Sequence, residues 1–367
     1  MVSSEHSIQA VDLTKRFGKL TAVRDVSFSV QPGEVVGFLG PNGAGKSTTM
    51  RILTGVMPAT SGEAWVCGEP VARFPERIKR RIGYMPENNP LPEDLRVGEY
   101  LRLRAQLKNI PWRQQARQVQ RVMDICDLSR KARRKIIGSL SKGFRQRVGI
   151  ADALLGEPEV IIMDEPTIGL DPHQIQAMRD LIRSLRGRMT VLLSSHILPE
   201  IELCTDRIVI INQGHIVATG TAGELRKAFV PETTYEVELS GSVSPLEATV
   251  KRVDPDIRVR DTFPVPGLPG RMKVRLTARG PSDHGPSLLR ALGKLEGTTV
   301  HSLARCEPTL EAVFMAATRR SWDERSDKLH FGKGSSHAPF RTVADPGSGN
   351  GDDAEADKDR ESKGSGQ

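Results

Sequence analysis

Cysteine is scarce in this sequence of 367 residues, which contains only four. The four are far apart, so they form neither the close pairs of a zinc site nor the framework of a disulfide-stabilised secreted domain. We therefore expect reduced, partly buried thiols. The residues are Cys67, Cys126, Cys204 and Cys306.

Long apolar runs are also missing. The longest are short strand-like pieces such as Val160 to Met163, whereas a membrane-spanning helix needs about 18 consecutive apolar residues. The N-terminal segment lacks the charged start and apolar core of a secretory signal. These absences favour a chain that does not itself cross a bilayer and that works in the cytoplasm.

Aromatic residues make up 4% of the chain, and basic residues do not interleave with them as they do on nucleic-acid-binding surfaces. We therefore expect no nucleic-acid partner. The formal net charge of +8 is compatible with a partner at an anionic membrane surface, but it favours an ordinary solvated basic surface. The length leaves room for about two domains.

The segment GPNGAGKST matches the phosphate-binding pattern of glycine, any four residues, glycine, lysine, and serine or threonine. Its glycines allow positive φ angles and let backbone N–H groups approach phosphate oxygens. Lys46 can then contact the β- and γ-phosphates, and the Ser47 hydroxyl can bind magnesium. The candidate phosphate-binding residues are Gly40, Pro41, Asn42, Gly43, Ala44, Gly45, Lys46, Ser47 and Thr48.

The flanking sequence has the order that a phosphate loop requires. Glu34 to Leu39 is a short apolar run that predicts a buried strand. Lys46 to Thr54 predicts a helix that ends at Gly55 and whose N-terminus faces the phosphates. The alternative is a glycine-rich surface turn before an ordinary helix.

Two further regions predict supporting structure. Short alternating apolar segments from Ile8 to Val30 predict antiparallel strands, and Phe17 lies at a turn beside Gly18. The Phe17 ring can stack on an adenine base or simply pack within the turn. Leu95 to Leu155 is rich in Arg, Gln and Leu at helical spacing, which predicts an inserted helical subdomain at about residues 90–155.

Glu159 to Glu165 (EVIIMDE) predicts a second buried strand that ends in two carboxylates. Asp164 can hold magnesium and Glu165 can polarise an attacking water, although such residues can also be solvated turn charges. His196 lies just beyond a third predicted strand, Thr190 to Ser194. It can reach a γ-phosphate or be purely structural.

A second candidate anion site lies at Gly138 to Arg147 (GSLSKGFRQR), where Ser141 and Gly143 begin a predicted helix. Helix N-termini bind anions because their first backbone N–H groups have no partner within the helix. The alternative is a helix cap without any ligand.

The pattern changes from Tyr235 onward, where strands and helices alternate and predict a small ferredoxin-like α+β domain at residues 234–320. Its last predicted helix is Thr309 to Arg319. After Ser321 the composition turns to Gly, Ser, Asp and Lys, so we expect a disordered tail at residues 321–367.

Together the motifs resemble the nucleotide-binding subunit of an ATP-binding cassette (ABC) transporter, from about Ile8 to Phe229. The resemblance implies an α/β P-loop NTPase fold at residues 6–230, with an antiparallel β subdomain and a helical subdomain. It also implies a role for each motif. Phe17 corresponds to the aromatic that stacks on adenine, Gly40 to Thr48 to the Walker A loop, Glu87 to the Q-loop glutamine, Ser141 to Phe144 to the signature motif, Asp164 and Glu165 to the Walker B pair, Leu170 and Asp171 to the D-loop, and His196 to the switch histidine.

The signature motif and the Q-loop depart from the commonest family pattern. The signature reads LSKGF in place of LSGGQ, so Lys142 replaces a glycine and Phe144 a glutamine, while Ser141 and Gly143 remain. Glu87 in place of glutamine keeps an oxygen that can approach magnesium but adds a charge. We therefore expect the coupling between nucleotide and permease to differ in detail.

The family architecture also implies partners. Two cassettes pair head to tail, so that Ser141 and Gly143 of one cover the ATP on the P-loop of the other, and this single-cassette chain is expected to form a homodimer or to pair with another cassette. A separate integral membrane permease would hold it on the inner face of the cell membrane. Pro308 to Thr318 and Tyr84 to Leu101 resemble ATPase subunits of ABC-2 type bacterial export systems.

The leading hypothesis is a transport-coupled ATPase that binds ATP and Mg²⁺ and powers export through the permease. The alternative is a soluble, nucleotide-gated ABC binding or regulatory module without transport. A P-loop kinase or GTPase is less favoured, because LSKGF and the D-loop would then have no role. The expected catalytic residues are Glu165, His196 and Lys46, and the expected magnesium ligands are Ser47, Asp164 and Glu87.

Overall fold

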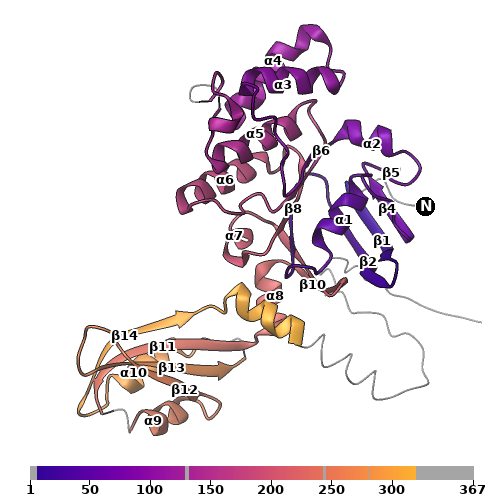
Figure 1. Ribbon diagram of the computed structural model, residues 1–367. Coiled ribbons are helices and arrows are strands. Elements are labelled where there is room, and N and C mark those ends of the chain that lie inside the picture. Colours follow the sequence, from indigo (N-terminus) through magenta and orange to yellow (C-terminus); the bar gives the residue numbers. More distant parts are fainter. Residues whose placement is uncertain (1–5, 129–131, 243–244, 281, 320–367) are drawn as a thin grey trace, which may run out of the picture. The chain divides into compact units, whose positions relative to one another are not determined.

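A computed structural model of the chain describes residues 6–128, 132–242, 245–280 and 282–319 (Figure 1). The tail at residues 321–367, predicted to be disordered, lies outside the described residues. Within those four ranges, no helix is both long and apolar enough to cross a membrane.

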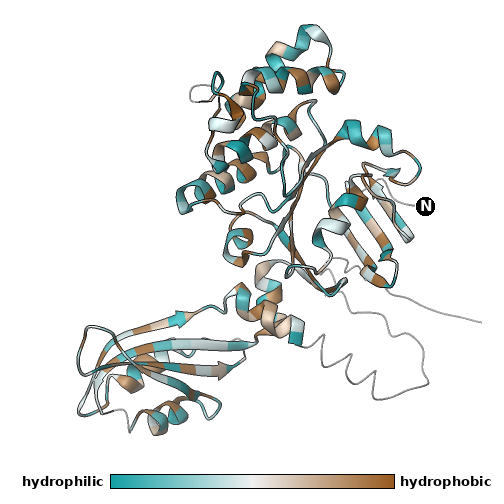
Figure 2. Ribbon diagram, in the orientation of Figure 1, coloured by the Kyte–Doolittle hydropathy of each residue, from teal (hydrophilic) through white to brown (hydrophobic). Residues whose placement is uncertain are grey.

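A six-stranded sheet with the order β10-β9-β3-β8-β7-β6 carries the predicted phosphate-binding segments. Neighbouring strands are parallel, apart from the antiparallel pair of β9 and β10. The inner strands β3, β7 and β8 are buried at every residue, and Figure 2 shows apolar colouring along the central strands. The strands are β3 (Val35–Leu39), β6 (Ile82–Met85), β7 (Val160–Asp164), β8 (Thr190–Ser195), β9 (Arg207–Asn212) and β10 (His215–Gly220).

Helices connect the parallel strands, and the strands' carboxyl ends meet at one edge of the sheet, where ligands bind in open α/β folds. The loops after β3, β7 and β8 therefore share that edge. The helices of this part are α1 (Lys46–Leu53), α6 (Pro172–Leu185), α7 (Leu198–Glu202) and α8 (Ala222–Phe229).

A separate antiparallel sheet, with the order β2-β1-β4-β5, packs against α1 and the central sheet. Met50 of α1 and Phe38 of β3 belong to one hydrophobic cluster with Phe28 of β2, and the two phenylalanine ring centroids are 5.3 Å apart. The elements are β1 (Ile8–Phe17), β2 (Leu20–Val30), β4 (Ser61–Val66), β5 (Glu69–Pro70) and the helix α2 (Pro75–Arg81).

The segment predicted to be helical contains α3 (Val97–Leu107), α4 (Trp112–Ile125), the short 3₁₀ helix η1 (Ile137–Ser139) and α5 (Lys142–Leu154). Polar contacts of Asp152 fasten α3 to the end of α5. Arg104 Nε donates to both carboxylate oxygens of Asp152 at 2.9 Å, and Tyr100 donates to the same carboxylate at 3.0 Å. Burial raises the pKa of Tyr100, so its hydroxyl remains a donor at neutral pH.

The C-terminal part contains a four-stranded antiparallel sheet with the order β12-β13-β11-β14. Helices α9 and α10 contribute Leu246, Val250, Leu288 and Leu292 to a hydrophobic core beneath the sheet. The elements are β11 (Glu232–Gly241), α9 (Leu246–Val253), β12 (Arg258–Pro264), β13 (Arg271–Arg279), α10 (Gly285–Leu292) and β14 (Thr298–Cys306).

The last described helix, at residues 310–319, does not share the core of that domain. Leu310 and Val313 instead join the large hydrophobic cluster of the central sheet, together with Leu225 of α8. Arg226 Nε also donates to the Pro308 carbonyl at 2.7 Å. The domain predicted at residues 234–320 includes this helix. Its helical pattern specifies an apolar face but not the surface that covers it.

Leu310→Ala is expected to lower the free energy of unfolding by about 2–5 kcal/mol, since it opens a cavity in a packed core. The matched control is Glu311→Ala, because Glu311 is the exposed neighbour in the same helix. Urea titrations of the two variants measure the difference. Equal stability of the two would contradict the packing described here.

Candidate phosphate-binding and catalytic site

The loop between β3 and α1 has room only for glycine at two of its positions. A Cβ at Gly40 would lie 2.4 Å from the Ile211 carbonyl oxygen, and one at Gly45 would lie 2.6 Å from the Ala22 carbonyl oxygen. Gly45 also has a φ angle of 106°, which other residues rarely adopt. The loop is thus pressed against β2 and β9 while its other side stays open, as at Gly43, where an added Cβ would meet nothing within 4 Å.

Lys46 begins α1 and its side chain is buried. Its Nζ donates to the Gly40 carbonyl at 2.7 Å and lies 3.3 Å from Glu165 Oε1. The ammonium group is therefore held over the loop from which backbone N–H groups would contact phosphates. Ser47 and Thr48 follow in the first turn of the same helix, half buried.

The two predicted carboxylates lie at the end of β7, and both residues are buried. Ser194 of the neighbouring strand β8 fixes them: its Oγ donates to Asp164 Oδ1 at 2.5 Å and accepts from the Glu165 N–H at 2.9 Å. Glu165 itself has a φ angle of 51°, in the left-handed region that non-glycine residues seldom occupy. Such backbone strain concentrates at functional sites.

Ser194 was missed from the sequence, where it ended an otherwise apolar strand. The available signal was its place at the carboxyl end of a strand beside the acidic one. The parallel register pairs it with Asp164, and that register is set by the fold rather than by local sequence.

His196 contacts the second oxygen of the same carboxylate, with its Nδ1 2.7 Å from Glu165 Oε2. Glu165 thus has one oxygen toward Lys46 and one toward His196, in a buried position. A carboxylate oriented in this way can accept a proton from a water molecule, provided that phosphate takes over the charge of Lys46. The structure brings together the three residues predicted to be catalytic.

Glu87 is exposed and lies two residues after the end of β6, at the carboxyl edge of the central sheet. The pKa of Tyr84 is raised chiefly by burial, next by Asp164 and to a smaller extent by Glu87, while Arg51 acts in the opposite direction. Tyr84 is therefore near two of the three predicted magnesium ligands, Asp164 and Glu87. In the described part of the chain, His, Cys, Asp and Glu side chains form no group of three that could hold a metal. Mg²⁺ usually combines one or two protein ligands with waters and substrate phosphates.

Phe17 lies at the turn between β1 and β2 and is 45% exposed. Its ring faces the Lys15 ammonium group, 5.3 Å from the ring centroid. The strand β2 begins at Leu20 and touches the phosphate loop at Ala22, which abuts Gly45. The aromatic ring is thus on the hairpin that borders the loop.

Ser141 and Gly143 stand at the start of α5, with Ser141 exposed at the N-cap and making no capping bond through its side chain. In the part of the chain that the structure describes, no hydrogen bond or ion pair joins either residue to the P-loop of the same chain. The motif instead packs on the segment after β7. A Cβ at Gly143 would lie 2.6 Å from the Gln174 side chain, and one at Gly169 would lie 2.3 Å from Lys142 Nζ.

Asp171 has a defined structural role in that segment. Its Oδ1 accepts from the Gln174 N–H at 2.9 Å and caps α6. Capping fixes the first turn of α6, from which Gln174 reaches Gly143.

A family profile described as ABC transporter matches residues 23–168. The linearmycin resistance ATP-binding protein LnrL of Bacillus subtilis is 32% identical over 321 residues, which are 86% of this chain and 99% of that protein. The bacitracin transport ATP-binding protein BcrA of Bacillus licheniformis is 39% identical over 222 residues, 60% of this chain and 71% of its own.

A solved structure of the ATP-binding subunit of an ABC transporter superposes with a TM-score of 0.55 at 34% sequence identity. The superposition covers 60% of this chain and 92% of that one.

Ser194→Ala is expected to lower the free energy of unfolding by about 1–3 kcal/mol, because it leaves the buried Asp164 oxygen and Glu165 N–H without their partner. The matched control is Ser184→Ala in α6, which removes one bond to the Leu181 carbonyl and should cost about 0.5 kcal/mol or less. Denaturant titration compares them. A loss no larger than that of the control would refute the positioning role.

Proposed function

Since the chain belongs to the ATP-binding cassette (ABC) transporter family, we propose that it is the ATP-hydrolysing subunit of an export-type ABC transporter. The observation that carries the proposal is the Glu165 carboxylate, which lies 3.3 Å from Lys46 and 2.7 Å from His196. A carboxylate between a phosphate-loop lysine and a histidine is suited to orient the water that attacks a γ-phosphate.

When ATP binds, Lys46 exchanges its ion pair with Glu165 for one with the phosphates. The phosphates attract Lys46, so Glu165 Oε1 becomes available to accept a hydrogen bond from water, while Oε2 remains with His196. Lys46 and the loop N–H groups then stabilise the charge on the transferred phosphoryl group. Ser47, Asp164 and Glu87 are the side chains that would hold Mg²⁺, which supplies further charge neutralisation.

The adenine is proposed to stack on the exposed ring of Phe17. An exposed aromatic ring at a hairpin that borders the phosphate loop offers a flat apolar surface at the right end of the nucleotide. Stacking does not distinguish purines by hydrogen bonding, so we expect weak discrimination between ATP and GTP at this residue.

A second copy is proposed to complete the site. Ser141 and Gly143 begin a helix whose N-terminal N–H groups suit a phosphate, and they pack on the D-loop side rather than on their own P-loop. In a head-to-tail homodimer the same residues reach the partner's nucleotide. Lys142, where glycine is commonest, then adds a positive charge beside that phosphate.

The proposed partner is an ABC-2 type membrane permease, which holds the chain on the cytoplasmic face of the membrane. Two relatives are named for linearmycin resistance and bacitracin transport, and removal of a toxic compound is an export task. These names favour a transport subunit over a soluble regulatory module. The strand and helix order after residue 231 supports a ferredoxin-like C-terminal domain.

Glu165→Gln is expected to bind ATP with little change in affinity and to lower its turnover by about 10²–10⁴-fold, the usual contribution of a general base. The control is Glu159→Gln, which removes the same charge at the other end of β7, where Glu159 pairs with Arg81. Phosphate release and nucleotide binding are both measured. Unchanged turnover in the first variant would exclude Glu165 as the base.

A mixing experiment tests whether Ser141 acts on the partner's nucleotide. Lys46→Ala and Ser141→Arg are each expected to be inactive alone. Random pairing of equal amounts gives about half mixed dimers, each with one complete site, so about one quarter of the wild-type ATPase rate should return. If Ser141 served its own P-loop, the mixture would stay inactive.

A further inference from the structure

The four-stranded C-terminal sheet has an open, charged face opposite α9 and α10. On it, cationic side chains of β13 stand against carboxylates of β11. Lys273 lies 3.4 Å from Glu236 and 3.6 Å from Glu238, and Arg275 lies 3.0 Å from Glu236. Across the middle of the face the charges therefore neutralise one another.

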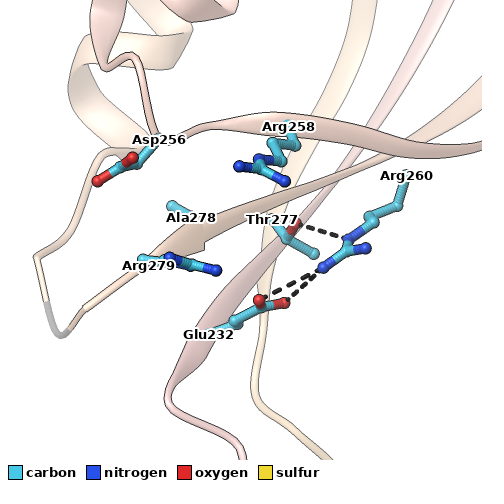
Figure 3. Close-up of a pocket in the computed structure, with 7 residues that line it drawn as sticks. All are labelled: Glu232, Asp256, Arg258, Arg260, Thr277, Ala278 and Arg279. Carbon is cyan, nitrogen blue, oxygen red and sulfur yellow. Dashed lines mark hydrogen bonds and ion pairs between the residues drawn. The ribbon is translucent and has the colours of Figure 1, made fainter.

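At one end of this face the positive and negative charges do not cancel. Arg258, Arg260 and Arg279 line a pocket with Glu232, Asp256, Thr277 and Ala278 (Figure 3). Figure 3 shows the guanidinium groups of Arg258 and Arg279 turned toward the space between the strands. Three arginines and two carboxylates leave one net positive charge in a small volume.

The strand register explains why the arginines converge. Arg258 is opposite Thr277 and Arg279 is opposite Glu232, so both lie on the open face. A β-bulge between Val259 and Asp261 inserts Arg260 as an extra residue in β12. Bulges of this kind redirect a side chain, often next to a functional site.

The three arginines are not equally engaged. Arg260 donates to Thr277 Oγ1 at 3.2 Å and to the Glu232 carboxylate at 3.3–3.4 Å. Within the described residues, the guanidinium groups of Arg258 and Arg279 have no hydrogen bond or ion pair, unlike that of Arg260. Two guanidinium groups in one pocket that make no direct ion pair repel each other, and an anion bound between them would offset that repulsion.

We propose that this pocket, called here the arginine pocket and lined by Arg258, Arg260 and Arg279, binds the phosphate group of a phosphate monoester or free phosphate. A phosphate is largely dianionic at neutral pH and has three strong acceptor oxygens. The planar guanidinium group matches phosphate oxygens in pairs, which an ammonium group cannot do. A carboxylate carries one charge and two oxygens, so it offers the two unpaired guanidinium groups less charge and fewer acceptor oxygens than a phosphate does.

The first test uses the full chain and the arginine reagent phenylglyoxal, with modification measured separately at each arginine by peptide mass spectrometry. Inorganic phosphate is expected to slow the modification of Arg258 and Arg279 about tenfold at about ten times its dissociation constant. Arg252 and Arg290, exposed on α9 and α10, should react at an unchanged rate. Reading each residue separately distinguishes this pocket from phosphate at the P-loop.

The second test asks whether the phosphate belongs to a lipid. Vesicles of phosphatidylcholine with phosphatidic acid, a phosphate monoester, are compared in flotation with vesicles of equal charge that contain phosphatidylserine. The variant is Arg258→Gln with Arg279→Gln, and the matched control is Arg252→Gln with Arg290→Gln, which removes two charges from the helical side of the same domain.

Protection by inorganic phosphate without flotation would support the proposal with a free phosphate as ligand. Flotation that prefers phosphatidic acid and that only the pocket variant loses would support it with a lipid headgroup as ligand. Equal reactivity with and without phosphate, together with flotation that is absent or the same in both double variants, would overturn it.

Discussion

The buried carboxylate of Glu165 is the constraint on which the rest of the cassette depends. It lies 3.3 Å from the buried Lys46, and removal of either charge would leave the other uncompensated away from water. The pair forms only because β3 and β7 are parallel, with β8 between them, so that both end at one edge of the sheet. The contact between Lys46 and Glu165 therefore links the topology of the sheet to the chemistry of the site.

The antiparallel sheet and the helical segment contact the central part at positions that have no side chain. The antiparallel sheet meets the phosphate loop where Ala22 abuts Gly45, and the helical segment meets the central sheet where a Cβ at Gly83 would lie 2.3 Å from the Ala153 carbonyl. Backbone thus packs directly on backbone at both junctions. Such junctions are rigid, since they contain no rotatable side chain that could absorb a displacement.

Sequence patterns predicted the parts of the site that are local in the chain. The spacing of Gly40 to Thr48 and the pair Asp164 and Glu165 follow from the chemistry of a single loop or strand end. Ser194 could not be predicted in this way, because its role arises from the register with a strand 30 residues away. The cluster that the helix at residues 310–319 joins could not be predicted for a related reason, since amphipathic spacing shows which face is buried but not its partner.

The contact between Gly143 and Gln174 has a consequence for how this sequence can evolve. The glutamine side chain occupies the space that a Cβ at residue 143 would need, so a larger residue at 143 requires this side chain to move. A larger residue at 143 demands a smaller or differently directed one at 174. Substitutions at residue 143 in the signature helix and at residue 174 in the helix after the D-loop are therefore expected to occur together. Covariation of these two positions among related cassettes would reflect the contact between the two helices.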